Sequence, residues 1–378
     1  MLKKLRLRDY DFKLILMVIA LASIGVLAIG SADESLQTRQ LAGVVVGAFL
    51  MLILSFFNYS WVLKFYWPMY ILNIALLVLV WVMGESRGVA QRWLKIGSLQ
   101  FQPSETAKIL LILFFAQFIM KYKEKLNTVR IIGACLLLFA LPWYLVMDQP
   151  DLSTSIVLAI LFCVIMFVGG VSLKLVFGVL AIAIPAIALL ISMALRPDMQ
   201  PDNDFFHGFQ QERLLAFFNQ EEYPDQNRQQ ANSEKAIGSG MLDGKGYKNN
   251  EITSVKNGNF VAEDETDFIF AIIGEEFGFK GSIVVILLLF GISLDCISVA
   301  RKSKDLAGSI IAASVGGLVA FQGFINIGVA TFILPNTGLP LPFVSYGLTS
   351  LMSLFMGMGF VLNVRLQAKN NKLREGIN

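Results

Sequence analysis

The sequence has little charge and very few residues of the types that usually carry acid–base or metal chemistry. Only 16% of its 378 residues are charged, whereas a soluble domain carries about 25%. His207 is the only histidine, so neither a histidine-based metal centre nor a Ser-His-Asp set is supported. The three cysteines (Cys135, Cys163 and Cys296) fall in or beside apolar runs, which favours buried thiols over a disulfide framework. Any acid–base chemistry must therefore come from carboxylates, lysine or tyrosine.

Apolar residues are abundant instead, at 56% of the chain with a mean hydropathy of +0.65. These values argue against a soluble enzyme, a disordered chain and a nucleic-acid binder. Runs of about 20 apolar residues cross a bilayer as helices. We predict an all-α polytopic membrane protein, a single domain over residues 1–378, with about ten transmembrane helices. The predicted spans are approximately 12–31, 41–57, 66–83, 105–120, 131–147, 155–170, 174–195, 281–300, 307–333 and 348–364.

The basic residues are unevenly divided between alternate connections. They gather before the first span, around 121–130, at Lys174, at 301–304 and after the tenth span, whereas 148–154 and 334–347 contain none. By the positive-inside rule this distribution predicts that both termini are cytoplasmic. The outer connection 84–104 breaks the pattern, and its cations either bind an anion or meet lipid headgroups.

One long polar segment, 196–266, is predicted to be an extracellular loop. Within it, 209–219 is amphipathic and predicts a short interfacial helix. The glycines at 236–246 form either a flexible loop or a place where backbone N–H groups approach a phosphate. No strand-glycine-helix context accompanies them, so neither a Walker loop nor a dinucleotide site is supported.

Asp267 lies where this polar segment meets an apolar helix. An ionisable group at membrane depth is a candidate functional residue. Partial burial raises the pKa of a carboxyl group, which would suit it to accept a proton near neutral pH. The alternative is that Thr266 or Asp267 is the N-cap of the helix that follows.

Three further charged residues are predicted on the same outer face. Pro103 indicates a helix start, and Glu105 and Lys108 lie three residues apart on one face of that helix. They either pair with each other or, with Arg92, face a negatively charged headgroup, Glu105 then orienting Lys108.

Two other outer segments are rich in capping residues or proline. Residues 149–154 predict a capped start to the sixth span. Residues 334–347 contain three prolines, and such backbone is tolerated at membrane depth only inside protein or beside a wet cavity. This predicts a re-entrant outer segment in which Ser345 and Tyr346 either make polar contacts or simply pack.

Four stretches, in order, together resemble one family. They are "RWLKIGSLQFQPSETAK" at 92–108, "QPDLSTS" at 149–155, "AIGSGMLDGKG" with "TDFIFAIIGEEFG" within 236–278, and "LPNTGLPLPFVSYG" at 334–347. Over essentially its whole length the chain resembles the SEDS proteins (shape, elongation, division and sporulation), the group of RodA and FtsW. The wording of the last motif and the segment "RDYDFKLIL" lean towards RodA.

The resemblance implies a peptidoglycan glycosyltransferase that polymerises lipid II on the outer face of the bacterial plasma membrane. The family's proposed catalytic Asp falls on Asp267, which would take the proton of an acceptor hydroxyl. Arg92 and Lys108, with or without a divalent cation (Mg or Mn), would stabilise the diphosphate leaving group, and no organic cofactor is implied. The family works with a class B penicillin-binding protein. The family's Pro-Glu-x-His-Thr-Asp reads Ala262-Glu-Asp-Glu-Thr-Asp267 here, which puts substrate fit in doubt more than reaction class.

Two alternatives of other classes remain open on the residues alone. A flippase for the same lipid would pass the diphosphate along the cavity cations. A non-catalytic scaffold would make the intramembrane charges purely structural. A flippase needs access from both faces, whereas the unusual residues gather on the outer face. A scaffold should tolerate Asp267→Asn and Arg92→Ala together.

Overall fold

The computed structural model describes residues 10–87, 90–96, 99–149, 151–176, 178, 181, 185, 213, 215–219, 223–248 and 265–375, and most of this chain is helical. The long helices are α1 (Phe12–Ala32), α2 (Glu34–Phe56), α4 (Tyr66–Met83), α5 (Pro103–Tyr122), α6 (Val129–Asp148), α7 (Leu152–Val168), α10 (Pro224–Ser239), α11 (Ile269–Arg301), α12 (Leu306–Ala330) and α13 (Leu348–Glu375). Short helices occupy Tyr59–Val62 (α3), Leu63–Phe65 and Lys123–Lys125.

The helices confirm the polytopic prediction. Eight helical stretches are long and apolar enough to cross a membrane, and α7 is a shorter apolar helix. Helices suit this environment because every backbone hydrogen bond is satisfied within the segment. The predicted span 174–195 lies largely outside the described residues. Within the predicted interfacial helix at 209–219, residues 213 and 215–218 are described as helical.

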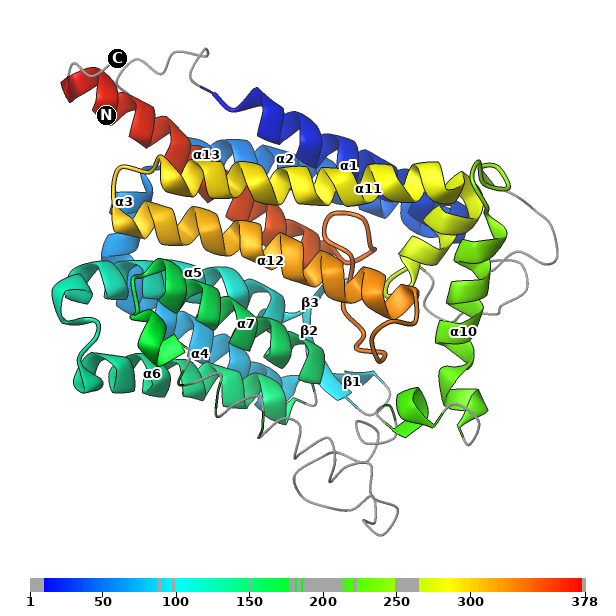
Figure 1. Cartoon of the computed structure of the whole chain (residues 1–378), viewed down its shortest axis with the longest axis horizontal. Coiled ribbons are helices and arrows are strands. Elements are labelled where there is room, and N and C mark those ends of the chain that lie inside the picture. The colour runs from blue at the N-terminus through cyan, green and yellow to red at the C-terminus, as the bar shows by residue number, and fades with distance from the viewer. Residues whose placement is uncertain are drawn as a thin grey trace, which may run out of the picture.

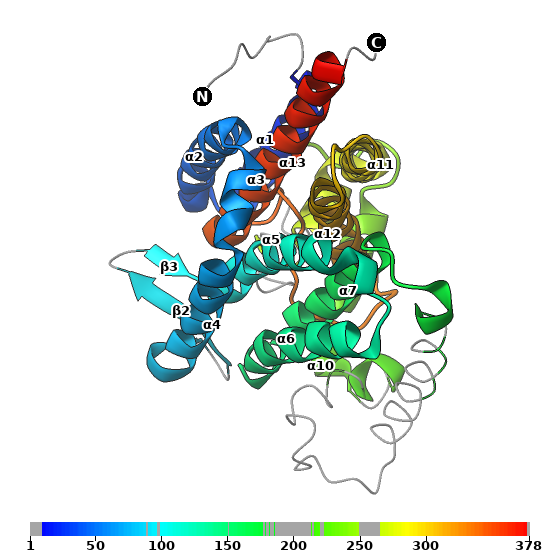
Figure 2. The same ribbon diagram turned by 90° about the vertical axis from the view of Figure 1, so that its left-hand side faces the viewer.

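Three helices form the centre of the bundle. Most of α5, α12 and α13 is buried, whereas α2, α4 and α6 expose most of their surface. Figure 2 shows α5 near the middle of the end-on view. Close contact between α2 and α13 depends on small residues: a Cβ added to Gly359 would lie 2.8 Å from the Met51 carbonyl oxygen. Small residues let membrane helices approach this closely.

The bundle has two different ends (Figure 1). The terminal end, where α1 begins and α13 ends, also carries the turns at 123–128 and 302–305. The sheet end carries α10, the non-helical residues 331–347 and three short strands. The basic turns thus lie at the same end as both termini, and the orientation of this end in the membrane stays a prediction.

The connection 84–104 folds as a small antiparallel sheet. Its strands are β1 (Glu85–Arg87), β2 (Ala90–Ile96) and β3 (Leu99–Phe101), in the order β1-β2-β3. Leu94 pairs with Phe101 in the register of β2 and β3. Helix α5 begins two residues later, at Pro103, as predicted.

The prediction of non-helical chain between α12 and α13 is confirmed. Residues 332–347 form turns and irregular backbone, with Leu339, Leu341, Phe343 and Val344 buried among the helices. Their enclosure in protein explains how irregular backbone is tolerated there. We call residues 334–347 the re-entrant segment.

Helix α11 begins earlier than predicted and is broken at Gly278, whose φ of 63° and ψ of −160° are non-helical. The break frees backbone groups on both sides, and the segment 240–246, here called the clasp, pairs with them. The amides of Lys245 and Gly246 donate to the carbonyls of Glu275 and Glu276, at 2.9 and 3.0 Å. The amides of Phe279 and Lys280 donate to the carbonyls at 241 and 242.

The clasp corrects the prediction for the glycines. Residues 236–239 belong to α10 and are not a loop. Gly240 and Gly244 lie so close to α11 that a Cβ on either would collide with backbone at Gly274 or Glu276. These two glycines permit contact between backbones, not contact with a phosphate.

Candidate functional site

Asp267 lies in the turn 265–268 that precedes α11, and it is half-buried. The helix begins at Ile269 with Phe268 as its N-cap residue. The prediction that Thr266 or Asp267 caps the helix is therefore wrong. The Asp267 backbone is held from α12, because the Asn326 side-chain amide donates to its carbonyl at 2.8 Å.

The Asp267 carboxylate lies against the re-entrant segment at Gly338. A Cβ built on Gly338 would be 3.2 Å from Asp267 Oδ2, and Gly338 has a φ of +74°. A left-handed φ is costly for residues other than glycine. Glycine, the amino acid without a side chain, thus stands where the backbone passes the Asp267 carboxylate.

Residues 337–340 are fixed by neighbours from two helices. Ser153 of α7 donates to the carbonyl of Thr337. From α12, Gln322 donates to the carbonyl of Pro340 at 2.9 Å and Asn326 to that of Leu339 at 2.6 Å. Since Asn326 also holds the Asp267 backbone, one amide ties both sides of the Asp267–Gly338 contact.

Lys108 is buried in the centre of the bundle. Its ammonium group donates to Glu105 Oε1 at 2.7 Å and to Gln322 Oε1 at 3.2 Å, and only 1% of its surface is exposed. The predicted Glu105–Lys108 pair is confirmed. A buried charge needs such a partner because leaving water is expensive. Through Gln322 the pair is linked to the re-entrant segment, while contact of Glu105 or Lys108 with a substrate stays a prediction.

Arg92 on β2 is the more accessible cation, with 23% of its side chain exposed. Its Nε donates to the Gln149 carbonyl at 3.3 Å, and its Nη1 lies 3.7 Å from Asp151 Oδ1. Asp151 is the N-cap of α7 and accepts from the Thr154 amide at 3.2 Å, so the predicted capped start is confirmed. Arg92 is thereby tied to the same helix start that holds Thr337.

Ser345 and Tyr346 hold the turn before Asp267. The Ser345 hydroxyl donates to the Thr266 carbonyl at 2.5 Å and accepts from the Leu341 amide at 2.7 Å. The Tyr346 amide donates to the Glu265 carbonyl at 2.9 Å. Both residues act on the position of Asp267, and their contact with a substrate stays a prediction.

Gln322 and Asn326 are the site residues that sequence reasoning missed. They are buried, four residues apart on one face of α12, and both reach the re-entrant segment. Two amides in an apolar span were the available signal, because polar groups at membrane depth need partners there.

Among the described residues, no group of three His, Cys, Asp or Glu side chains is arranged to hold a metal ion. Magnesium commonly uses one or two carboxylates together with substrate phosphates. The site residues therefore fit a divalent cation only if it is bound jointly with a diphosphate. The acids at 263 and 264 lie outside the described residues.

The comparisons with known proteins cover nearly the whole chain. A family model described as "Cell cycle protein", for FtsW, RodA and SpoVE, matches residues 10–370. The peptidoglycan glycosyltransferase MrdB of Escherichia coli is 31% identical over 95% of this chain and 94% of its own length. The probable peptidoglycan glycosyltransferase FtsW of Bacillus subtilis is 28% identical over 99% and 96%.

Solved structures of similar proteins also cover nearly the whole chain. A chain from the work titled "Structural coordination of polymerization and crosslinking by a peptidoglycan synthase complex" has a TM-score of 0.78 at 28% identity and covers 95% of this chain and 98% of that chain. RodA of Thermus thermophilus has a TM-score of 0.69 at 27% identity, covering 94% and 96%. The chain belongs to the SEDS family of polytopic membrane proteins, the group of FtsW, RodA and SpoVE.

Proposed function

We propose that this protein is a peptidoglycan glycosyltransferase that polymerises lipid II at the outer face of the plasma membrane, in cell-wall elongation and cell shape. The observation that carries the proposal is the position of Asp267. Its carboxylate is half-buried and faces Gly338 in a segment fixed by Ser153, Gln322 and Asn326. These hydrogen bonds fix the backbone on both sides of the carboxylate, which would help to pre-organise Asp267 for proton transfer.

In the proposed reaction, Asp267 accepts the proton of the C4 hydroxyl of an acceptor sugar. The hydroxyl oxygen forms a bond to the anomeric carbon of a donor sugar, and the bond from that carbon to the polyprenyl diphosphate breaks. A single displacement inverts the anomeric centre. Diphosphate leaves as an anion without a general acid, unlike the alcohol that leaves in glycoside hydrolysis.

Cations stabilise the charge that develops on the leaving group. Arg92 is the candidate for direct contact because part of its side chain is exposed. Lys108 is a positioning residue in this proposal, since Glu105 and Gln322 surround its ammonium group. A divalent cation, magnesium or manganese, would accompany the diphosphate and add Lewis-acid stabilisation.

The proposed partner is a class B penicillin-binding protein. Support comes from the structural relative described in work on a complex that couples polymerisation to crosslinking. A transpeptidase beside the sheet end would receive the growing glycan on the membrane face where it is made.

The test is polymerisation of purified lipid II by Asp267→Asn protein in detergent, with the partner present. Loss of the base should lower the rate by about 10²–10⁴-fold. Glu265→Gln is the matched control. It removes the charge of a neighbouring acid but keeps the backbone carbonyl that accepts from the Tyr346 amide, so it should keep most activity. Wild-type rates from folded Asp267→Asn protein would remove the assignment. Polymer formation in detergent needs no transport and thus also separates a polymerase from a flippase.

A further inference from the structure

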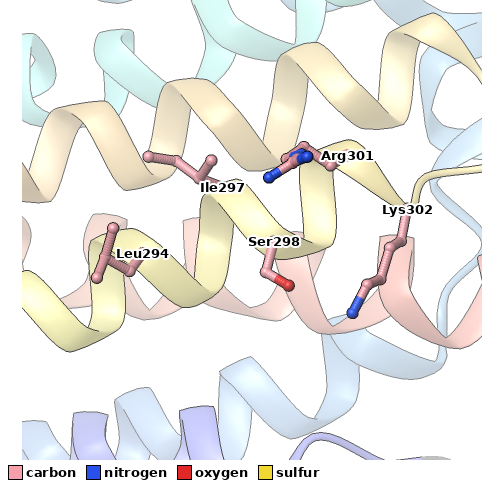
Figure 3. A pocket seen from close by; sticks show the side chains of 5 residues that line it. All are labelled: Leu294, Ile297, Ser298, Arg301 and Lys302. Carbon is pink, nitrogen blue, oxygen red and sulfur yellow. The ribbon is translucent and has the colours of Figure 1, made fainter.

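A basic groove lies at the terminal end, far from the residues that surround Asp267. Its first part, a hollow of about 490 Å³, is lined by Leu294, Ile297, Ser298, Arg301 and Lys302 of α11 and the turn after it (Figure 3). An adjoining hollow shares Ser298 and Lys302 and extends to Arg365, Ala368 and Lys369 of α13. We call the two hollows together the basic groove.

Two of the cations in the basic groove, Arg301 and Lys302, have no acid partner among the described residues. Arg365 is paired instead, with both Asp11 and Asp295, and Lys13 also lies 3.7 Å from Asp295. Arg301 and Lys302 are exposed, and neither side chain has a carboxylate or hydrogen-bond partner among the residues described. An anion in the groove would therefore meet two uncompensated cations.

Ser298 supplies a hydroxyl group at the junction of the two hollows. Two other serines of α11, Ser282 and Ser293, donate to the carbonyl four residues earlier. Ser298 makes no such bond within the described part of the chain, and it is half-buried. Its hydroxyl remains able to donate to an oxygen bound between the hollows.

An apolar surface adjoins the charged one. Leu294 and Ile297 are about half exposed. They precede Arg301 by two turns and one turn on the same face of α11. Residues at this spacing share a helix face. A free phosphate would use the cations alone, whereas a lipid would place its phosphate at Ser298 and Lys302 and an acyl chain along Leu294 and Ile297.

We propose that the basic groove binds the phosphate headgroup of an anionic diacyl phospholipid. Basic residues in the last turn also complement the helix dipole, whose negative end opposes anion binding here. That effect accounts for Arg301 alone and explains neither the unbonded Ser298 hydroxyl nor the hollow against α13. Basic pockets between helices on the cytoplasmic side are suited to anionic headgroups, and this end is the predicted cytoplasmic one.

The experiment measures binding of phosphatidylglycerol and phosphatidylcholine with matched acyl chains to the purified full-length protein in detergent, by native mass spectrometry. The wild-type protein should retain phosphatidylglycerol in preference to phosphatidylcholine. The double variant Arg301→Gln/Lys302→Gln should bind phosphatidylglycerol about 25-fold less well, since each cation near an anionic headgroup contributes about five-fold. Ser298→Ala should weaken it about three-fold through loss of one hydrogen bond.

The matched control is Lys123→Gln/Lys125→Gln, which removes the same charge from exposed positions at the same end of the bundle. An equal loss of lipid in this control would overturn the proposal, because it would mean diffuse attraction to headgroups. Displacement of the lipid by equimolar inorganic phosphate would also overturn it in favour of a free-anion site. Neither readout depends on glycosyltransferase activity, so the result is independent of the proposed function.

Discussion

The cations near the candidate site and two of the cations at the terminal end, Arg301 and Lys302, are treated in opposite ways. At the sheet end, Arg92, Lys108 and Lys245 each face a carboxylate that is at most 4% exposed. At the terminal end, Arg301 and Lys302 are exposed with no acid partner among the described residues. Pairing is what allows a charge to be buried. The paired charges therefore hold the fold around Asp267, whereas the unpaired ones remain available to an external anion.

Helix α11 joins these two ends and differs along its length. Before Gly278, nearly every residue from Ile269 to Glu276 is buried, and the clasp holds the backbone. After Gly278, exposed apolar residues such as Leu287 and Phe290 alternate with buried ones. The short first part positions the turn that contains Asp267, and the long second part is an ordinary lipid-facing span.

The largest effect should come from Glu105→Leu. This change leaves the Lys108 ammonium group buried without its carboxylate, and breaking such a pair costs about 3–5 kcal/mol. Thermal unfolding of the purified protein in detergent would measure it. Glu105→Leu/Lys108→Met should recover most of the loss, and Arg301→Gln at the other end should change stability by less than about 0.5 kcal/mol. A double variant no more stable than the single one would contradict the comparison.

Asn326→Leu should have the next largest effect. It removes two hydrogen bonds, to the carbonyls of Asp267 and Leu339. Each carbonyl left unsatisfied costs about 1–3 kcal/mol, and lipid II polymerisation should fall with stability because Asp267 is released. Ser314→Ala on the same helix is the control, since the Ser314 hydroxyl is buried and has no partner in the described chain. Equal losses in both variants would mean that Asn326 has no special role.

Lys245→Met tests the clasp. Glu275, 4% exposed, would lose the ammonium group that lies 2.7 Å away, at a cost of about 2 kcal/mol. Lys248→Met, two residues beyond the clasp, is the control, because Lys248 pairs with Glu34 at the surface. That hydrogen bond raises the pKa of Lys248, yet exposed pairs contribute little to stability. Matching shifts of the unfolding midpoint would contradict the distinction between buried and exposed pairs.

Gly338→Ala should have the smallest effect on stability, about 1–2 kcal/mol for a left-handed φ. Its effect on polymerisation should be larger, because the new Cβ would press on the Asp267 carboxylate. Gly133→Ala in α6 is the control, as a Cβ there meets nothing within 4 Å, and it should leave both properties unchanged or slightly improved. Full activity in the Gly338 variant would argue that this contact does not position the base.

Much of the architecture was predictable because it depends on local composition. Apolar runs indicated the spans, Pro103 the start of α5, and the three prolines of 334–347 the irregular backbone between α12 and α13. The spacing of Glu105 and Lys108 predicted their pairing, since both residues lie on one helix face.

Other features depend on contacts between distant segments. A cap at Thr266 or Asp267 was expected from the local sequence. It is not found, because α11 begins at Ile269 with Phe268 as its N-cap residue. The glycines near 240 resembled a loop, although two of them serve contact with the α11 backbone more than 30 residues away. Gln322 and Asn326 were overlooked because an amide in an apolar span does not reveal its partner.

The sequence by itself determined the membrane class, the asymmetry of charge between the two ends and the identity of the acid at 267. These follow from the transfer of side chains between water and hydrocarbon, which depends on composition. Only the tertiary structure decided that Gly338 lies against that acid, that α12 amides hold the contact and that Arg301 and Lys302 have no partner in the described part of the chain. Such outcomes depend on which groups meet after the helices pack, because hydrogen bonds and ion pairs act over only a few ångströms.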